Sequence, residues 1–231
     1  MTRELNNILK TASVEVRNEN IARIFKQNKR ILTLVLAIAI SGSICFTAYK
    51  INNKIQQEKF SEMLHQSMID QQIGEIEKSK TTLKKIHESS SAPNGIKSLA
   101  SLRYAGILID EDKKEEALNV YKQINNCRFC DAYIKDLSAL LMVRTILTDE
   151  SLFNKAEFVA DLEKIENKAK ILRYYIAEQR GYLELNKNNF ASAYKIFEMI
   201  AKNPDVKEAL KNRASDAMKI VIQKGYDPKS S

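Results

Sequence analysis

A long uncharged stretch near the N-terminus sets the layout of this chain. Residues 31–49 are 19 consecutive uncharged residues, and Arg30 and Lys50 flank them. As an α-helix this stretch would be roughly 28 Å long, close to the roughly 30 Å hydrocarbon core of a bilayer. Such a helix satisfies its own backbone donors and acceptors in lipid. We therefore expect a single transmembrane helix at residues 31–49.

A cleaved signal peptide is the competing interpretation of the same stretch. Signal peptides combine a short basic start with an apolar segment of about 7–15 residues and a small-residue cleavage site. In this chain a tail of 30 residues precedes the stretch, the stretch is longer, and Ser41-Gly42-Ser43 is a weak cleavage site. These differences favour an uncleaved anchor.

Basic residues on the two flanks predict the orientation of the anchor. Residues 1–49 contain seven Lys and Arg, four of them within residues 23–30, whereas the three Lys of residues 50–59 are spread more widely. This bias keeps the N-terminus in the cytoplasm and sends the C-terminal part across the membrane. The tail at residues 1–30 is partly amphipathic, so it lies either on the inner leaflet or in solvent as a helix.

Small residues recur at four-residue spacing within the expected membrane helix. They form two stripes: Ala37, Ser41 and Cys45, and Ala39, Ser43 and Thr47. Such spacing places each stripe on one helix face, where a second membrane helix can approach closely. The alternative is the ordinary small-residue content of membrane helices, and both interpretations remain open.

The scarcity of turn-forming residues limits the fold of the rest of the chain. Six Gly and three Pro in 231 residues are far below the usual combined share of about 12%. This scarcity argues against sandwiches, barrels and Rossmann-type folds, which need tight turns and glycine loops. Apolar periodicity instead predicts helices joined by short turns. The expected ranges are a continuation to about residue 70, then 75–87, 96–110, 113–125, 131–148, 153–166, 168–186, 189–202 and 205–224.

Two segments of this helical region resemble each other. Residues 115–124 read EEALNVYKQI, and residues 191–200 read ASAYKIFEMI. Each copy combines two small residues, 12 apart, with an aromatic residue: Ala105, Ala117 and Tyr121, and Gly181, Ala193 and Phe197. Small residues let two helices of a pair approach closely, which is the pattern of the tetratricopeptide hairpin. The expected fold is all-α, with a tetratricopeptide-like helical-hairpin solenoid at residues 50–231; an irregular helical bundle is the alternative.

This layout resembles the bacterial inner-membrane proteins typified by the ancillary subunit of the Sec translocon. The shared features are the short basic tail, the single span and the degenerate repeats described above. Within that group the chain is most similar to a rickettsia-type family of the same layout. The resemblance implies an inner-membrane protein whose domain at residues 50–231 is periplasmic and associates with the translocon and with periplasmic chaperones.

Cys127-Arg128-Phe129-Cys130 is the only sharp local motif. Two cysteines at this spacing form a disulfide, half of a zinc site or a redox pair. A thioredoxin-like role needs a βαβ setting, and the two histidines lie far away in the sequence. In an oxidising compartment a Cys127–Cys130 disulfide is therefore the expected state, with free thiols or a catalytic dithiol as alternatives.

No other pattern indicates catalysis or a cofactor. The chain has no glycine-rich phosphate loop, zinc-protease motif or nucleophile elbow. Residues 50–231 carry 30 basic and 26 acidic residues without a concentrated basic stripe, which does not support nucleic-acid binding. We expect a protein that is not an enzyme and has no cofactor, metal or small-molecule substrate.

Tetratricopeptide arrays bind partners through the inner face of the first helix of each pair. Alignment with that pattern predicts six partner-binding residues: Tyr133, Asp136, Arg144, Tyr175, Glu178 and Tyr182. Tyrosine buries much area at low entropic cost, and charged residues add direction. The alternative interpretation is that some of these tyrosines belong to the apolar core.

We therefore expect a membrane-anchored protein–protein interaction module that assists protein translocation or periplasmic chaperoning. One alternative is a thiol-redox protein that uses Cys127 and Cys130. Another is a membrane-tethered regulator that acts through its cytoplasmic tail.

Overall fold

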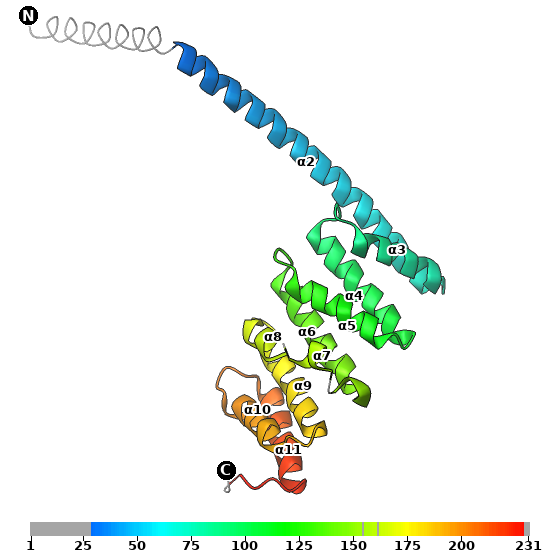
Figure 1. Ribbon diagram of the computed structural model, residues 1–231, viewed down its shortest axis with the longest axis vertical. Coiled ribbons are helices and arrows are strands. Elements are labelled where there is room, and N and C mark those ends of the chain that lie inside the picture. Colours follow the sequence, from blue (N-terminus) through cyan, green and yellow to red (C-terminus); the bar gives the residue numbers. More distant parts are fainter. Residues whose placement is uncertain (1–28, 154, 161, 229–231) are drawn as a thin grey trace, which may run out of the picture. The chain divides into compact units, whose positions relative to one another are not determined.

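The computed structural model describes residues 29–153, 155–160 and 162–228, and these residues are helical with no strand among them (Figure 1). The all-α prediction is therefore confirmed. Residues 1–28, which hold most of the predicted cytoplasmic tail, lie outside the described residues. The chain divides into two compact units, residues 1–55 and residues 56–231, and the division falls within the first described helix, α2 (Lys29–Gln72).

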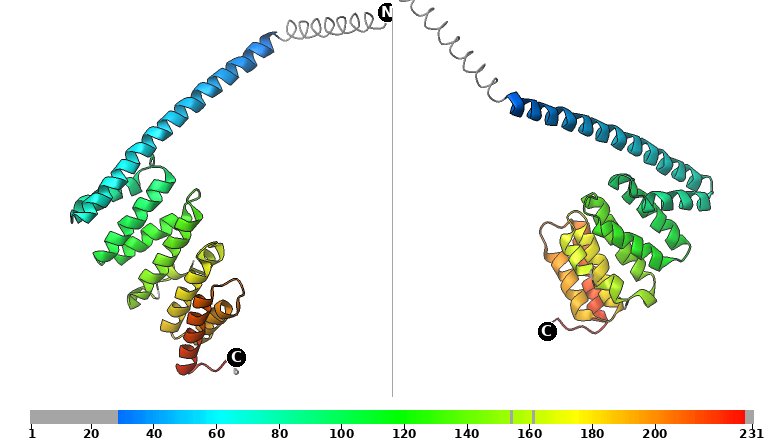
Figure 2. Two further views of the ribbon diagram at one scale, coloured as in Figure 1. Left: turned by 180° about the vertical axis from the view of Figure 1, so that it is seen from behind. Right: turned by 45° about the horizontal axis from the view of Figure 1, so that its top comes forward.

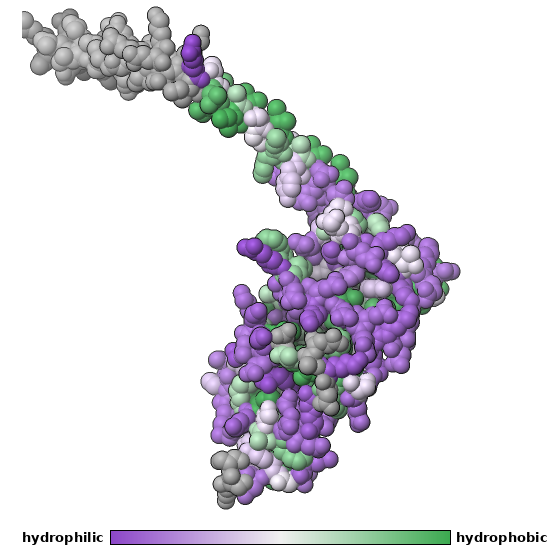
Figure 3. Space-filling view, in the orientation of Figure 1, coloured by the Kyte–Doolittle hydropathy of each residue, from purple (hydrophilic) through white to green (hydrophobic). Residues whose placement is uncertain are grey.

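The N-terminal part of α2 exposes many large apolar side chains, and Figure 3 shows apolar surface along the face in view. The apolar window of this helix has a mean hydropathy of 1.8, and none of it is buried within the protein. Leu36 and Ile44 are more than half exposed. The hydroxyls of Ser41 and Thr47 donate to the carbonyls of Ala37 and Ser43, at 2.8 and 2.9 Å. This helix is long and apolar enough to cross a membrane. The hydroxyls of Ser41 and Thr47 donate their hydrogen bonds to carbonyls of the same helix, so they need no partner from the surroundings.

The second unit is a succession of helices joined by short connections (Figures 1 and 2). They are α3 (Ile76–Glu88), α4 (Asn94–Asp110), α5 (Lys114–Asn126), α6 (Ala132–Leu147), η1 (Glu150–Leu152), α7 (Ala156–Val159), α8 (Leu162–Lys168), α9 (Arg173–Asn186), α10 (Phe190–Lys202) and α11 (Glu208–Gln223). From α3 to α6 and from α9 to α11, each helix packs against the next, and α6 packs directly against α9. Most of the bounds predicted from periodicity differ from these by no more than three residues.

The segment between α6 and α9 departs from the prediction of one helix at 153–166 followed by another at 168–186. It contains the short helices η1, α7 and α8, and α9 begins only at Arg173. Leu152, Phe153, Phe158 and Leu162 are all buried in the core. At 100° per residue these four side chains would point in widely different directions from a straight helix. Because the chain bends, all four reach the core.

The apolar core forms two clusters that meet at α9. Ile176 and Leu183 of α9 belong to the cluster that extends back to Phe60 of α2, whereas Ala177 belongs to the cluster formed with α10 and α11. Most helices thus pack against the helices next to them in the chain, and α6 packs against α9, rather than all around one central core. Burial of the apolar side chains stabilises such a stack by about 25 cal/mol per Å² of apolar surface.

Small residues make close packing possible between paired helices, as the repeat pattern predicts. A Cβ atom added to Gly181 of α9 would lie 2.7 Å from the ring of Phe197 on α10. In the other pair, Ala105, Ala117 and Tyr121 are all buried. The aromatic ring of α10 therefore lies directly against the backbone of α9, where only glycine leaves room.

We predict that Gly181→Ala destabilises the protein. The added methyl group collides with the Phe197 ring, and overpacking of this kind costs roughly 1–3 kcal/mol. The measurement is the free energy of unfolding in urea, with the full chain in a nonionic detergent.

Gly106→Ala is the matched control, because Gly106 lies within α4 and a Cβ atom there meets nothing within 4 Å. Alanine at this position should stabilise by about 0.5–1 kcal/mol through its helix propensity. Equal effects of the two substitutions would contradict the assigned contact.

Candidate functional site

Two hollows on the second unit adjoin each other along α6, α9 and α11. One, of about 600 Å³, includes Tyr133, Leu137, Leu140, Leu172, Tyr174, Tyr175, Lys207 and Leu210 in its lining. The other, of about 410 Å³, is lined by Leu140, Arg144, Tyr175, Glu178, Gln179, Tyr182 and Arg213. Leu140 and Tyr175 belong to both linings, so the two hollows adjoin. We refer to them together as the tyrosine groove.

Five of the six residues predicted to bind partners line the tyrosine groove. They are Tyr133, Arg144, Tyr175, Glu178 and Tyr182. Tyr133 and Arg144 are contributed by α6, and the other three by α9. The α6–α9 contact therefore brings together side chains that lie up to 49 residues apart in the sequence.

Asp136 is the predicted residue that does not line this groove. Its side chain is buried, and one carboxylate oxygen accepts hydrogen bonds from the backbone N–H groups of Lys170, Ile171 and Leu172, at 2.9, 2.6 and 3.0 Å. The carboxylate thus satisfies the donors of the loop that precedes α9. This interaction also explains why α9 begins at Arg173 rather than at residue 168.

Glu178 lies in the groove lining but is already engaged. It is 3% exposed, and the Arg213 guanidinium donates to both of its carboxylate oxygens, at 2.7 and 2.9 Å. This hydrogen-bonded pair raises the pKa of Arg213 above its usual range. The pair joins α9 to α11, and the Arg213 side chain is half exposed.

Cationic groups dominate the charge of the groove. Arg144 is exposed and makes no hydrogen bond or ion pair with another described residue. Lys207 is also exposed at the start of α11. The described lining residues include two carboxylates, Glu178 and Asp205. Arg213 neutralises Glu178, which leaves Asp205 as the one unpaired negative charge of the described lining. The groove therefore combines an apolar, aromatic floor with an excess of positive charge.

Arg213 and Tyr174 are groove residues that the sequence reasoning missed. Positions 144, 178 and 213 are 34 and 35 residues apart, close to the tetratricopeptide period of 34. That spacing was available in the sequence, but the alignment that selected the six partner-binding residues did not extend to the helix expected at residues 205–224. Tyr174 adjoins Tyr175 and accepts a hydrogen bond from the Asn203 amide at 2.8 Å.

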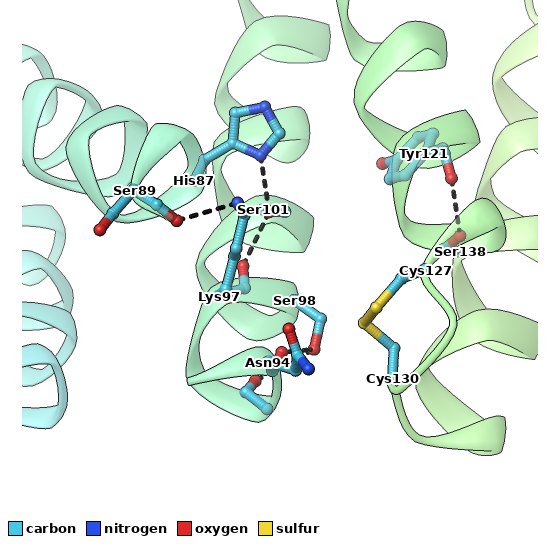
Figure 4. The surroundings of a disulfide bond; sticks show 11 residues. His87, Ser89, Asn94, Lys97, Ser98, Ser101, Tyr121, Cys127, Cys130 and Ser138 are labelled. Atoms are coloured by element: carbon cyan, nitrogen blue, oxygen red, sulfur yellow. Dashed lines mark hydrogen bonds between the residues drawn. A yellow bond between two sulfur atoms is a disulfide. The ribbon is translucent and has the colours of Figure 1, made fainter. Parts of the chain in front are cut away.

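Cys127 and Cys130 are joined by a disulfide in the turn between α5 and α6, with their Cα atoms 5.5 Å apart (Figure 4). A hollow of about 210 Å³ separates the disulfide from Asn94 and Ser98 of α4. His87 also lines this hollow, and burial lowers the pKa of its imidazole. No group of three His, Cys, Asp or Glu among the described residues is placed to hold a metal.

The geometry around His87 does not activate a nucleophile. His87 Nδ1 lies 2.8 Å from the hydroxyl of Ser101, which resembles a catalytic pair. The Ser101 hydroxyl, however, donates its hydrogen to the Lys97 carbonyl at 2.7 Å (Figure 4). His87 is then the donor to Ser101, whereas a general base must accept the serine proton.

Comparison of the chain with protein-family models, curated proteins and solved structures gave no match. The tyrosine groove and the disulfide turn therefore have to be interpreted from the residues of this chain alone.

We predict that Asp136→Ala destabilises the protein by roughly 3 kcal/mol, because it leaves three backbone N–H groups without their charged acceptor. Asp136→Asn keeps one acceptor oxygen and should lose roughly half as much. Urea denaturation of the full chain measures both.

Asp131→Ala provides the comparison, since Asp131 accepts hydrogen bonds from the N–H groups of Tyr133 and Ile134 at the exposed start of α6. Loss of such a cap costs about 1 kcal/mol. If Asp136→Ala lowers the free energy of unfolding no more than Asp131→Ala does, the structural role assigned to Asp136 is wrong.

Proposed function

We propose that this protein is a non-enzymatic, membrane-anchored module that holds a segment of a partner polypeptide in the tyrosine groove. The observation that carries the proposal is the convergence of Tyr133, Tyr175 and Tyr182 on one groove with Arg144 at its side. Tyrosine and arginine are the residues that most often dominate the energy of protein interfaces. The apolar part of α2 serves as the anchor.

The second unit, on this proposal, is a tetratricopeptide-like solenoid. Three features support it: each helix packs mainly on its neighbours, Gly181 allows the close α9–α10 contact, and groove residues recur at 34–35 residues. Solenoids present extended concave surfaces, which suit the binding of peptides. The departures between α6 and α9 are then a degenerate repeat, held in place by Asp136.

The chemistry of the groove defines the partner segment. Leu137, Leu140 and Leu210 offer apolar surface between the tyrosines, and Arg144 and Lys207 offer charges that no described carboxylate neutralises. A segment with apolar or aromatic side chains and nearby Asp or Glu complements both features. Its acidic residues would find Arg144 and the exposed edge of Arg213.

We further propose that the protein lies in a bacterial inner membrane with the second unit in the periplasm, near the translocon or its chaperones. Two features support a periplasmic location of the second unit: the charges that flank the span, and the disulfide between Cys127 and Cys130. A membrane anchor raises the local concentration of the groove around emerging polypeptides. Function then follows from geometry and proximity, without a chemical step.

A photo-crosslinking residue in place of Tyr133 tests the groove in intact membranes. We expect one main adduct whose crosslinked peptide contains apolar and acidic residues. The same residue in place of Lys195, which is exposed on α10, should give no such adduct.

A synthetic copy of the crosslinked peptide then allows the affinity to be measured by fluorescence anisotropy. Tyr175→Ala should weaken binding at least roughly tenfold, and Arg144→Glu should weaken it further because the new charge repels the acidic segment. An affinity that neither substitution changes would reject the groove as the binding site.

The topology has a separate test. We expect a reporter enzyme that folds only outside the cytoplasm to be active when it is fused after Ser231. The same fusion without residues 1–49 is the inactive control. An inactive reporter on the full chain, with the protein present in the membrane, would place the second unit in the cytoplasm.

A further inference from the structure

A third hollow, of about 340 Å³, collects positive charge on a part of the second unit that the tyrosine groove does not use. Its lining includes four cationic residues from separate elements: Arg128 of the α5–α6 turn, Lys135 of α6, and Lys168 and Lys170 at the end of α8 and beyond it. We call it the basic pocket. The four residues span 43 positions of the sequence, so only the fold brings them together.

These cations have no acidic partners within the described chain. Elsewhere Lys80 pairs with Glu111 at 2.6 Å, and Arg180 pairs with Glu166 at 2.6 Å. In contrast, none of the side chains of Arg128, Lys135, Lys168 and Lys170 forms a hydrogen bond or ion pair with a described carboxylate. Like charges that share one hollow repel each other, and an anion between them would remove that repulsion.

Among the described residues of the pocket lining, Asp136 is the one carboxylate, and it is already hydrogen-bonded. Its buried oxygen accepts the N–H groups of Lys170, Ile171 and Leu172. These three donors therefore compensate its charge, and they also hold Lys170 at the pocket wall. Four cations and one engaged carboxylate give the described lining residues an excess of three positive charges.

Two further contacts hold the pocket in shape. Arg128 lies between the two cysteines of the Cys127–Cys130 disulfide, which closes the turn around it. The Asn125 amide donates to the Tyr121 carbonyl at 3.0 Å and to the Ser138 hydroxyl at 2.7 Å. A site whose walls are fixed before the ligand arrives loses less entropy on binding.

We propose that the basic pocket binds a phosphate-type oxyanion, either free or as the headgroup of a lipid. A phosphate group carries about −1.5 to −2 charges at neutral pH and several acceptor oxygens, which match several lysines and an arginine. The guanidinium can bind two oxygens of the anion side by side, while the lysines act as point charges. The pocket thus adds an anion site to a domain whose groove binds polypeptide.

The test is isothermal titration calorimetry of the full chain in a maltoside detergent at low ionic strength, where screening is weak. The two probes are inorganic phosphate and dioctanoyl phosphatidic acid in the same micelles, with dioctanoylglycerol as the lipid that lacks a phosphate. Binding of inorganic phosphate identifies a free anion as sufficient. Binding of phosphatidic acid alone identifies a lipid headgroup.

The double variant Lys168→Gln and Lys170→Gln should weaken binding of the phosphate probe roughly tenfold or more. The matched control, Lys85→Gln and Lys195→Gln, removes the same charge from exposed positions on α3 and α10 and should leave the affinity unchanged. The proposal is overturned if neither probe binds, or if the control variant weakens binding as much as the pocket variant.

Circular dichroism and the melting temperature show whether the pocket variant keeps its fold. If it does not, Arg128→Gln gives the same test from the exposed α5–α6 turn. An Arg128→Gln protein with unchanged phosphate affinity would then overturn the proposal.

Discussion

The arrangement of this domain depends on the buried Asp136 carboxylate, which accepts hydrogen bonds from three backbone N–H groups. It ties α6 to the loop before α9. The α6–α9 contact that it supports creates the tyrosine groove, and the same loop carries Lys170 at the wall of the basic pocket. Without the carboxylate, three donors would be left unsatisfied near the core, at a cost of about 1–3 kcal/mol each.

Two further buried carboxylates act in a similar way in the C-terminal half. Glu166 binds Arg180 and joins α8 to α9, and Glu178 binds Arg213 and joins α9 to α11. Buried charges are costly unless they are paired, so each pair allows few relative placements of the helices it joins. Together with the close Gly181–Phe197 packing, these contacts fix the walls of the groove.

Local patterns made much of the site predictable, and long-range contacts made the rest unpredictable. The small residues Ala105, Ala117, Gly181 and Ala193 marked the helix pairs, and the repeat alignment pointed to Tyr175 and Tyr182. Nothing local distinguished Asp136 from a binding residue, because its partners are backbone groups 34–36 residues away. Arg213 did have a signal, its 35-residue spacing from Glu178, but the hydrogen bonds between their side chains join two separate helices and could not be read from the sequence.

The amino-acid sequence by itself determined the helical class, the helix bounds to within a few residues and the apolar stretch of α2, because periodicity and hydropathy are properties of neighbouring residues. Only the tertiary structure decided where the chain bends between α6 and α9 and which charges share a hollow. Those outcomes depend on burying Phe153 and Phe158 together and on satisfying distant donors such as the N–H of Ile171. Both depend on contacts between residues far apart in the chain, which no local pattern records.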